Sequence, residues 1–183
     1  MKYFTLILIF IIEINCLAQD KDLEDMVQNL KNVREMPYIP ELSGDSIFWV
    51  VVKQKIAIVP YLIDKLDDTT KINVFVPNFG GYYTMADVAY IAITEIIPSI
   101  PTDQFIKVKK SYKNKGFWFY WKYTRKSLEN RKKFKHRVQK WYQLNKNNLE
   151  WVEYKRKFRS ASNWKYEKNT HPSVGYYKLK NNQ

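Results

Sequence analysis

The sequence predicts a mainly α-helical fold, in which a small helical domain is joined to a basic, aromatic-rich helical carboxyl-terminal region with room for short strands. Apolar residues recur at helical spacing in the first hundred residues, and the net charge changes sign between the two halves. Hydrophobic residues make up 45% of the 183 positions, enough to enclose a core. This composition excludes a disordered chain, and a single cysteine excludes a disulfide scaffold or a Cys-rich zinc site.

The amino terminus has the pattern of a secretory signal peptide. A short positive start is followed by an apolar run over residues 4–12, and small residues precede Gln19. The run is too short for a membrane span, which takes about 20 apolar residues. We expect cleavage after Ala18, so that residues 1–18 are removed and the rest is exported to the periplasm or secreted. The alternative is a lipoprotein anchored through Cys16.

The rest of the chain divides into two regions of opposite charge. Residues 19–104 carry 7 Lys+Arg and 13 Asp+Glu, whereas residues 105–183 carry 23 and 4, which gives net charges of −6 and +19. An AT-rich genome accounts for many lysines but not for a step within one gene. We therefore expect an acidic helical half and a basic, aromatic-rich half that packs on it as one domain.

The acidic half has the apolar spacing of several helices. An amphipathic helix is predicted over residues 20–33, because acidic residues crowd its first turn, where the helix dipole favours them. A proline-containing linker follows. The apolar runs at 47–52 and 56–66 predict two near-continuous helices. Pro60 lies in the first turn of the second run, where proline costs little.

A central helix is predicted from Met85 to Ile97. A loop through Pro77 and two glycines leads to Thr84, whose hydroxyl can cap this helix in a capping box with Asp87. Apolar residues surround the helix on almost every side, so we expect it at the centre of the core.

Two segments in this region carry a resemblance to a known repeat. They are IVPYLIDKLDD at residues 58–68 and ADVAYIAITEI at residues 86–96. Together, from about Ile58 to Ile97, they resemble one HEAT repeat, although the loop between them is long and contains Gly and Pro. The pattern occurs once, whereas a solenoid needs about three units. The resemblance implies a helix pair and a protein-interaction module, and it transfers no catalytic residue.

The basic half combines aromatic rings with cations. Six of the seven residues at 117–123 are aromatic, and a helix of about 18 residues is predicted to start near Ser127. Residues 149–154 suit a short strand or a helix equally well. One broad stripe of the predicted helix is apolar: Leu128, Phe134, Val138, Trp141 and Tyr142. The opposite side is basic: Lys132, Lys133, Arg137 and Lys140.

These basic residues are our candidates for an anion-binding site. A second cluster adds Lys155, Arg156 and Arg159, and we expect Trp118 and Trp121 to supply aromatic contacts. The predicted partners are an acidic glycan, an anionic lipid surface or an acidic protein, with the acidic half of this chain as one candidate. Export excludes intracellular nucleic acid. The corresponding function is that of a non-enzymatic secreted or envelope binding protein, and a structural component without a small ligand fits the sequence equally well.

An enzyme is the alternative hypothesis. It would be a small hydrolase or accessory enzyme that uses Asp87 or Glu95 on the central helix, beside the glycines of the preceding loop. The chain has no recognisable catalytic or cofactor motif, and His136 and His171 lack motif partners. We therefore expect no catalytic residue, metal site or cofactor.

Overall fold

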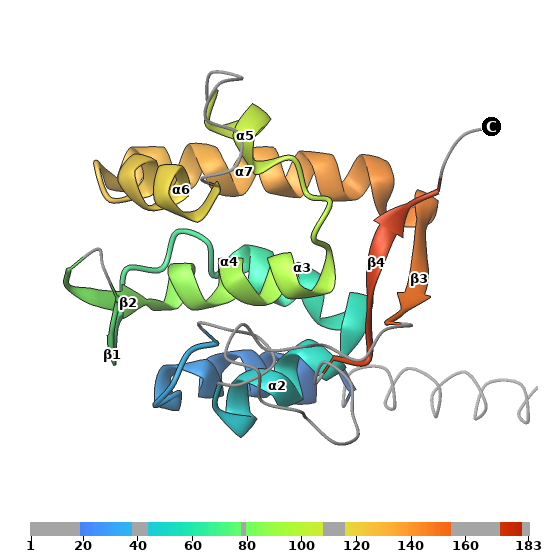
Figure 1. The fold of residues 1–183 in the computed structure, drawn as a ribbon, viewed down its shortest axis with the longest axis horizontal. Helices are drawn as coiled ribbons and strands as arrows, with labels where there is room; N and C mark the ends of the chain where they lie inside the picture. The colour runs from blue at the N-terminus through green and yellow to red at the C-terminus, as the bar shows by residue number, and fades with distance from the viewer. Residues whose placement is uncertain (1–18, 38–43, 78–79, 108–115, 155–172, 181–183) are drawn as a thin grey trace, which may run out of the picture.

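The computed structural model describes residues 19–37, 44–77, 80–107, 116–154 and 173–180 (Figure 1). Over these residues the fold is mainly α-helical with two small antiparallel sheets, which confirms the predicted class in its coarse form. The expected signal peptide lies outside the described residues. So do three of the candidate cations, Lys155, Arg156 and Arg159.

The elements follow one another from a helical segment at residues 19–29 to a carboxyl-terminal strand. The helices are α2 (Ser46–Lys53), α3 (Val59–Asp64), α4 (Met85–Ile96), α5 (Thr102–Phe105), α6 (Gly116–Thr124) and α7 (Leu128–Asn145). The strands are β1 (Lys71–Phe75), β2 (Tyr82–Thr84), β3 (Leu149–Glu153) and β4 (Gly175–Leu179). Short 3₁₀ turns are η1 (Leu30–Asn32), η2 (Lys55–Ile58) and η4 (Lys146–Asn148).

The two runs predicted as near-continuous helices are sharply bent. α2 and the segment formed by η2 and α3 meet at 104°, and Lys55 lies at the bend with a φ of 58°. The bend lets both runs turn apolar side chains such as Phe48 and Leu62 into the same core. Within the described ranges no single helix is long and apolar enough to cross a membrane. This bent pair passes such a test only when taken together.

The predicted loop through Pro77 and the two glycines is the connection of a β-hairpin, whose two strands were not predicted. β1 and β2 pair antiparallel, with Lys71 opposite Thr84 and Phe75 opposite Tyr82. The connection contains Gly80 and Gly81 at φ values of 74° and 81°, a conformation that glycine adopts without strain. Apolar residues alternate from position 72 to position 76, and this pattern is typical of a strand. The nearby proline and glycines favoured a loop instead.

The central helix α4 occupies the middle of the molecule, as predicted. Figure 1 shows α6 and α7 on one side of the layer that contains α4, and α2 on the other. Thr84 caps the helix, and Asp87 completes the expected capping box. Most of its side chains are buried, and they pack against α2 and α3.

Helix α7 matches the predicted length and buries Phe134 and Val138. Ser127 caps it by accepting a hydrogen bond from the Asn130 amide at 3.1 Å. Leu128, expected on the apolar stripe, is 50% exposed, because it lies at the edge of the buried face in the first turn. Trp141 and Tyr142, also on the expected stripe, are half-buried.

Residues 149–153 form a strand, which decides between the two predicted alternatives. β3 pairs antiparallel with β4 in continuous register, from Leu149 opposite Leu179 to Glu153 opposite Gly175. The rings of Trp151 and Tyr177 meet at 5.1 Å across the ladder. β4 was not predicted, because its five residues need a partner far away in the chain to form a strand.

A comparison of two glycines tests the packing of this second sheet. A Cβ on Gly175 would lie 2.4 Å from the Val152 carbonyl oxygen, whereas a Cβ on Gly80 would meet nothing within 4 Å. We expect Gly175→Ala to destabilise the protein by about 2 to 3 kcal/mol through overpacking. Gly80→Ala should cost only about 1 kcal/mol for its positive φ. Urea unfolding measures both values, and equal losses would contradict the described contact.

Candidate anion-binding surface

A buried carboxylate at the start of α4, that of Asp87, joins this helix to α6 and α7. The Asp87 side chain is 0% exposed, and its Oδ2 accepts hydrogen bonds from the Thr84 amide at 2.8 Å and the Thr84 hydroxyl at 2.7 Å. The bond from the Thr84 amide belongs to the capping box, which the Asp87 amide completes by donating to Thr84 Oγ1 at 3.4 Å. A carboxylate at this end of a helix also interacts favourably with the helix dipole.

Two arginines and a tyrosine from α6, α7 and the link between them complete the surroundings of Asp87. Arg125 Nη2 lies 2.8 Å from Oδ2, and Arg131 Nη1 lies 3.4 Å from Oδ1. The Tyr120 hydroxyl lies 3.3 Å from Oδ1 and 3.2 Å from the Ala86 carbonyl oxygen, and it donates to both. Arg125 also donates to the Tyr82 carbonyl, so it joins the hairpin to the same cluster. We call Thr84, Asp87, Tyr120, Arg125 and Arg131 the Asp87 cluster.

The cations on the inward face of α7 make contacts within the molecule. The Arg131 side chain is 4% exposed, and Lys135 Nζ donates to Asp67 Oδ1 at 3.0 Å. Lys135 also donates to the Asp64 carbonyl at 2.7 Å, at the end of α3. The guanidinium of Arg137 donates to the Phe105 carbonyl of α5. These cations hold α7 against α3, α4 and α5.

The outward face of α7 presents three exposed lysines. They are Lys132, Lys133 and Lys140, with exposed His136 between them. Lys133 pairs with Glu129 one turn earlier at 3.4 Å, and both side chains are more than half exposed. Such a pair is worth little in water, so the charge of Lys133 stays accessible to a ligand.

Two tryptophan rings of helix α6 each have a cationic side chain placed over one face. Lys122 Nζ lies 5.0 Å from the Trp118 ring, and the Arg125 guanidinium lies 3.7 Å from the Trp121 ring. Each pair is four residues apart, the spacing that places two side chains on one helix face. Trp118 is 41% exposed, whereas Trp121 is half-buried against Tyr83.

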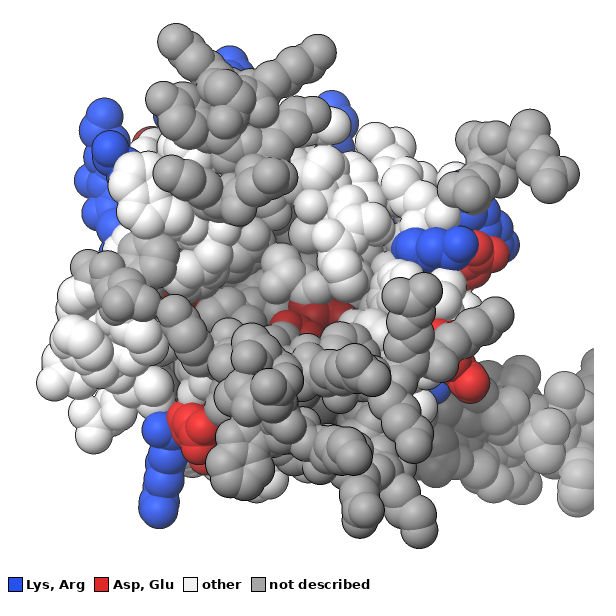
Figure 2. Space-filling view, viewed as in Figure 1, with Lys and Arg blue, Asp and Glu red and all other residues white. Residues whose placement is uncertain are grey.

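The structure therefore separates the predicted site residues into groups. Lys132, Lys133, Lys140 and Trp118 are exposed, and Arg137 and Trp121 are half-buried with partners. Figure 2 shows Lys and Arg side chains at the edge of the molecule where Figure 1 places α6. We call Trp118, Lys122, Lys132, Lys133 and Lys140 the α6–α7 surface. Lys122 was missed in the sequence, although its spacing from Trp118 was a usable signal.

The residues proposed for the enzymatic alternative have other roles or surroundings. Asp87 is fully buried, and both carboxylate oxygens already accept hydrogen bonds. Glu95 is half-buried on α4, and Gly80 and Gly81 belong to the hairpin connection. No group of three or more His, Cys, Asp or Glu residues is placed to hold a metal ion within the described ranges.

Comparisons with protein-family models, curated proteins and solved structures gave no match for this chain.

Two stacked tyrosines extend the Asp87 cluster across α4. The Tyr90 and Tyr120 rings lie 3.8 Å apart with an interplanar angle of 16°, and the Tyr90 hydroxyl lies 3.0 Å from Thr102 Oγ1. Burial raises the pKa of Tyr90 to about 12. Burial, followed by the charge of Asp87, also raises the pKa of Tyr120 well above its usual range. Both hydroxyls therefore stay protonated in the folded chain to a higher pH than that of an exposed tyrosine.

The raised pKa of Tyr90 predicts a loss of stability in alkali. Between pH 10 and pH 12 the unfolded chain loses the Tyr90 proton while the folded chain keeps it. The contribution of Tyr90 is thus complete below pH 10 and falls by about 1.4 kcal/mol per pH unit above it. Tyr90→Phe should cost about 1 kcal/mol at pH 8 through loss of the Thr102 hydrogen bond. This deficit should shrink as the pH rises through the window.

Denaturant unfolding at a series of pH values measures this effect. Tyr82→Phe is the matched control, because it removes a tyrosine hydroxyl from the exposed hairpin. A deficit for Tyr90→Phe that stays constant from pH 8 to about pH 12 would contradict the burial of this hydroxyl.

Proposed function

We propose that this is an exported, non-enzymatic protein that binds an acidic polymer along the α6–α7 surface. The observation that carries the proposal is the separation of cations on α7. Arg131 and Lys135 turn inward to carboxylates, while Lys132, Lys133 and Lys140 remain exposed on the opposite face. On α7, the cations that do not hold the helix to the rest of the fold therefore lie on one side of it.

The layout of these cations favours an extended ligand over a small anion. Lys132 and Lys140 are eight residues apart, which is about 12 Å along a helix at 1.5 Å per residue. A linear polymer lying along the helix can contact both lysines at the same time. Trp118 adds an exposed ring on which a sugar ring can pack. An acidic polysaccharide is thus the ligand class that fits best.

The proposed export determines the compartment in which the protein encounters such a ligand. The signal-peptide pattern at residues 1–18 supports encounter in the periplasm or outside the cell, where acidic glycans of the envelope are present. An anionic lipid surface offers the same negative charge without a sugar ring. The experiment below separates these two ligands.

We also propose that α3 and α4 correspond to one HEAT-like helix pair. The two helices pack against each other and carry the residues on which the resemblance depends. In this interpretation the β1–β2 hairpin replaces the short connection of an ordinary repeat. The proposal concerns the ancestry of the helix pair and assigns it no ligand.

Substitution of the three exposed lysines tests the proposed function. We expect Lys132→Gln, Lys133→Gln and Lys140→Gln together to elute from immobilised heparin at clearly lower salt than the unmodified protein. Each lost contact should reduce the slope of log affinity against log salt by about 0.7 to 0.9, as in other polyanion complexes. Trp118→Ala should weaken binding by about 1 kcal/mol, with little effect on the salt slope.

A charge-matched variant is the control. Lys21→Gln, Lys31→Gln and Lys53→Gln remove three exposed lysines from the acidic half and lower the net charge of +13 by the same amount. If both triple variants lose the same retention, only the total charge matters and the proposed surface is wrong. Stronger retention on anionic vesicles than on heparin, unaffected by Trp118→Ala, would replace the polysaccharide with a lipid surface.

A further inference from the structure

A histidine lies at the centre of the outward face of α7. His136 is exposed, whereas Phe134 is 0% exposed and Val138 is 1% exposed. Residues two positions apart lie about 200° apart around a helix axis, so the two buried side chains place His136 opposite the core. Within the described ranges it takes part in no hydrogen bond or ion pair. A ligand that lies on this face therefore meets His136.

The lysines of the α6–α7 surface surround this position. Lys132 and Lys140 are four residues before and after His136, the spacing that places side chains on one face of a helix. Each lysine is thus about 6 Å from the histidine along the helix axis. Lys133 lies three residues before it and is more than half exposed. His136 consequently occupies the gap between the two lysines that the proposed polymer has to span.

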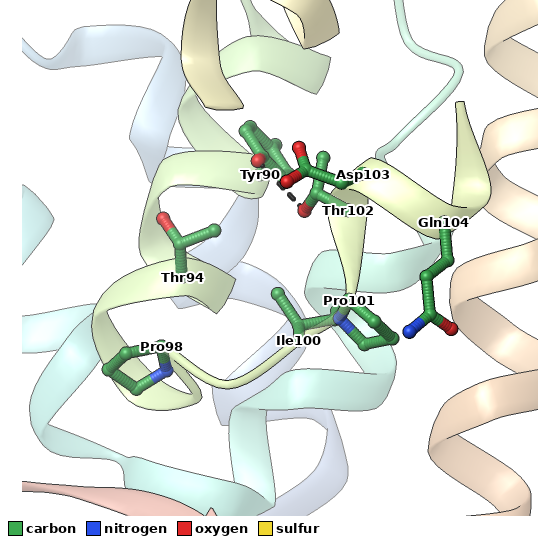
Figure 3. A pocket seen from close by; sticks show the side chains of 8 residues that line it. All are labelled: Tyr90, Thr94, Pro98, Ile100, Pro101, Thr102, Asp103 and Gln104. Atoms are coloured by element: carbon green, nitrogen blue, oxygen red, sulfur yellow. Dashed lines mark hydrogen bonds between the residues drawn. The ribbon is translucent and has the colours of Figure 1, made fainter. Parts of the chain in front are cut away.

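Two elements packed against α7 carry carboxylates that are turned to other groups. Asp64 and Asp67, at and just after the end of α3, lie 4.0 Å and 3.0 Å from Lys135 Nζ. Figure 3 shows Asp103 of α5 turned toward Tyr90, in a cavity between the end of α4 and the start of α5. The negative charge of Asp103 acts on the Tyr90 hydroxyl there. These carboxylates are therefore directed at groups other than the outward face of α7.

The other charges around α7 lie in the core or belong to the basic half. Asp87 of α4 is fully buried in the Asp87 cluster. Glu129, two turns before the histidine on the same helix, pairs with Lys133. Lys122 of α6 and Lys146 of η4 are exposed and add positive charge. Among the described residues, the charged side chains that neighbour the histidine on the outward face are thus lysines.

We propose that His136 belongs to the polymer-binding surface and makes its affinity depend on pH. The inference rests on the proposed binding of an acidic polysaccharide along the α6–α7 surface. Histidine changes charge between pH 5 and pH 8, whereas the ammonium group of a lysine stays charged throughout this range. When protonated, His136 completes a continuous row of cations from Lys132 to Lys140. When neutral, it leaves an uncharged position in the middle of that row.

The sign of the effect follows from the negative charge of the ligand. An anionic polymer binds the protonated form more tightly, because each additional cation in contact with the polymer releases about one more counterion. Binding is therefore strongest at the acidic end of the range and weakens as the pH rises through it. At about 0.15 M salt one such contact is worth about fivefold in affinity. The slope of log affinity against log salt should also be steeper by about 0.7 to 0.9 at the acidic end.

The test measures heparin binding at pH 5.5 and pH 7.5 for the unmodified protein and for two substitutions of this exposed residue. His136→Gln is neutral at both pH values and should bind with the weaker affinity at both. His136→Lys is charged at both and should bind with the stronger affinity at both. Each variant should thus lose the pH dependence, and the two should differ by about fivefold. His171→Gln replaces the other histidine of the chain and is the matched control, which should keep the pH dependence.

The pattern of results separates this inference from the proposed function. If the triple substitution of Lys132, Lys133 and Lys140 lowers retention while His136→Gln keeps the pH dependence, the inference is wrong and the proposed surface stands. If the triple variant loses no more retention than its charge-matched control, the proposed surface is wrong and the inference fails with it. Equal affinity of the unmodified protein at the two pH values also overturns the inference. A melting curve at each pH verifies that every variant is folded.

Discussion

The ion pairing of Asp87 is the interaction on which the arrangement of this protein depends. An isolated ionised carboxylate at 0% exposure is too costly to bury, so the fold has to bring cations to it. Arg125 and Arg131 supply them, and both come from the basic half of the sequence. The capping box fixes the carboxylate at the start of α4, and the two arginines then fix where α6 and α7 lie on that helix.

This constraint changes how the charge of the chain should be interpreted. The net charge of +13 and the step from −6 to +19 describe the sequence, but they do not describe a binding surface. Arg131 is buried in the core, where it pairs with Asp87, and Lys135 pairs with Asp67 at the edge of α3. Only the cations that remain outside can meet a ligand, and on α7 they are the lysines opposite the buried face. Because the same helix makes both sets of contacts, the Asp87 cluster also orients the proposed binding surface.

Local patterns in the sequence predicted the helical elements well and the strands poorly. The Thr84–Asp87 capping box and the length of α7 follow from residues close together in the chain. Neither sheet does, because β4 requires β3 as a partner and the glycines hid the β1–β2 hairpin. The helical pattern placed Lys132, Lys133 and Lys140 correctly on an outer face. It could not show that Arg137 bonds to α5 or that Asp103 borders a cavity, since both depend on contacts made only after folding.

A double-mutant cycle between Asp87 and Arg131 tests the central claim most directly. The free energy of unfolding is measured for Asp87→Asn, Arg131→Met and the double variant. Asp87→Asn should cost about 3 to 5 kcal/mol, because it leaves Arg131 buried without its carboxylate. Arg131→Met should cost less, because Arg125 still pairs with Asp87. The double variant should cost clearly less than the sum, with a coupling energy above about 1.5 kcal/mol. If the cost of the double variant equals the sum of the two single costs to within about 0.5 kcal/mol, the two side chains do not depend on each other. That result would contradict the account.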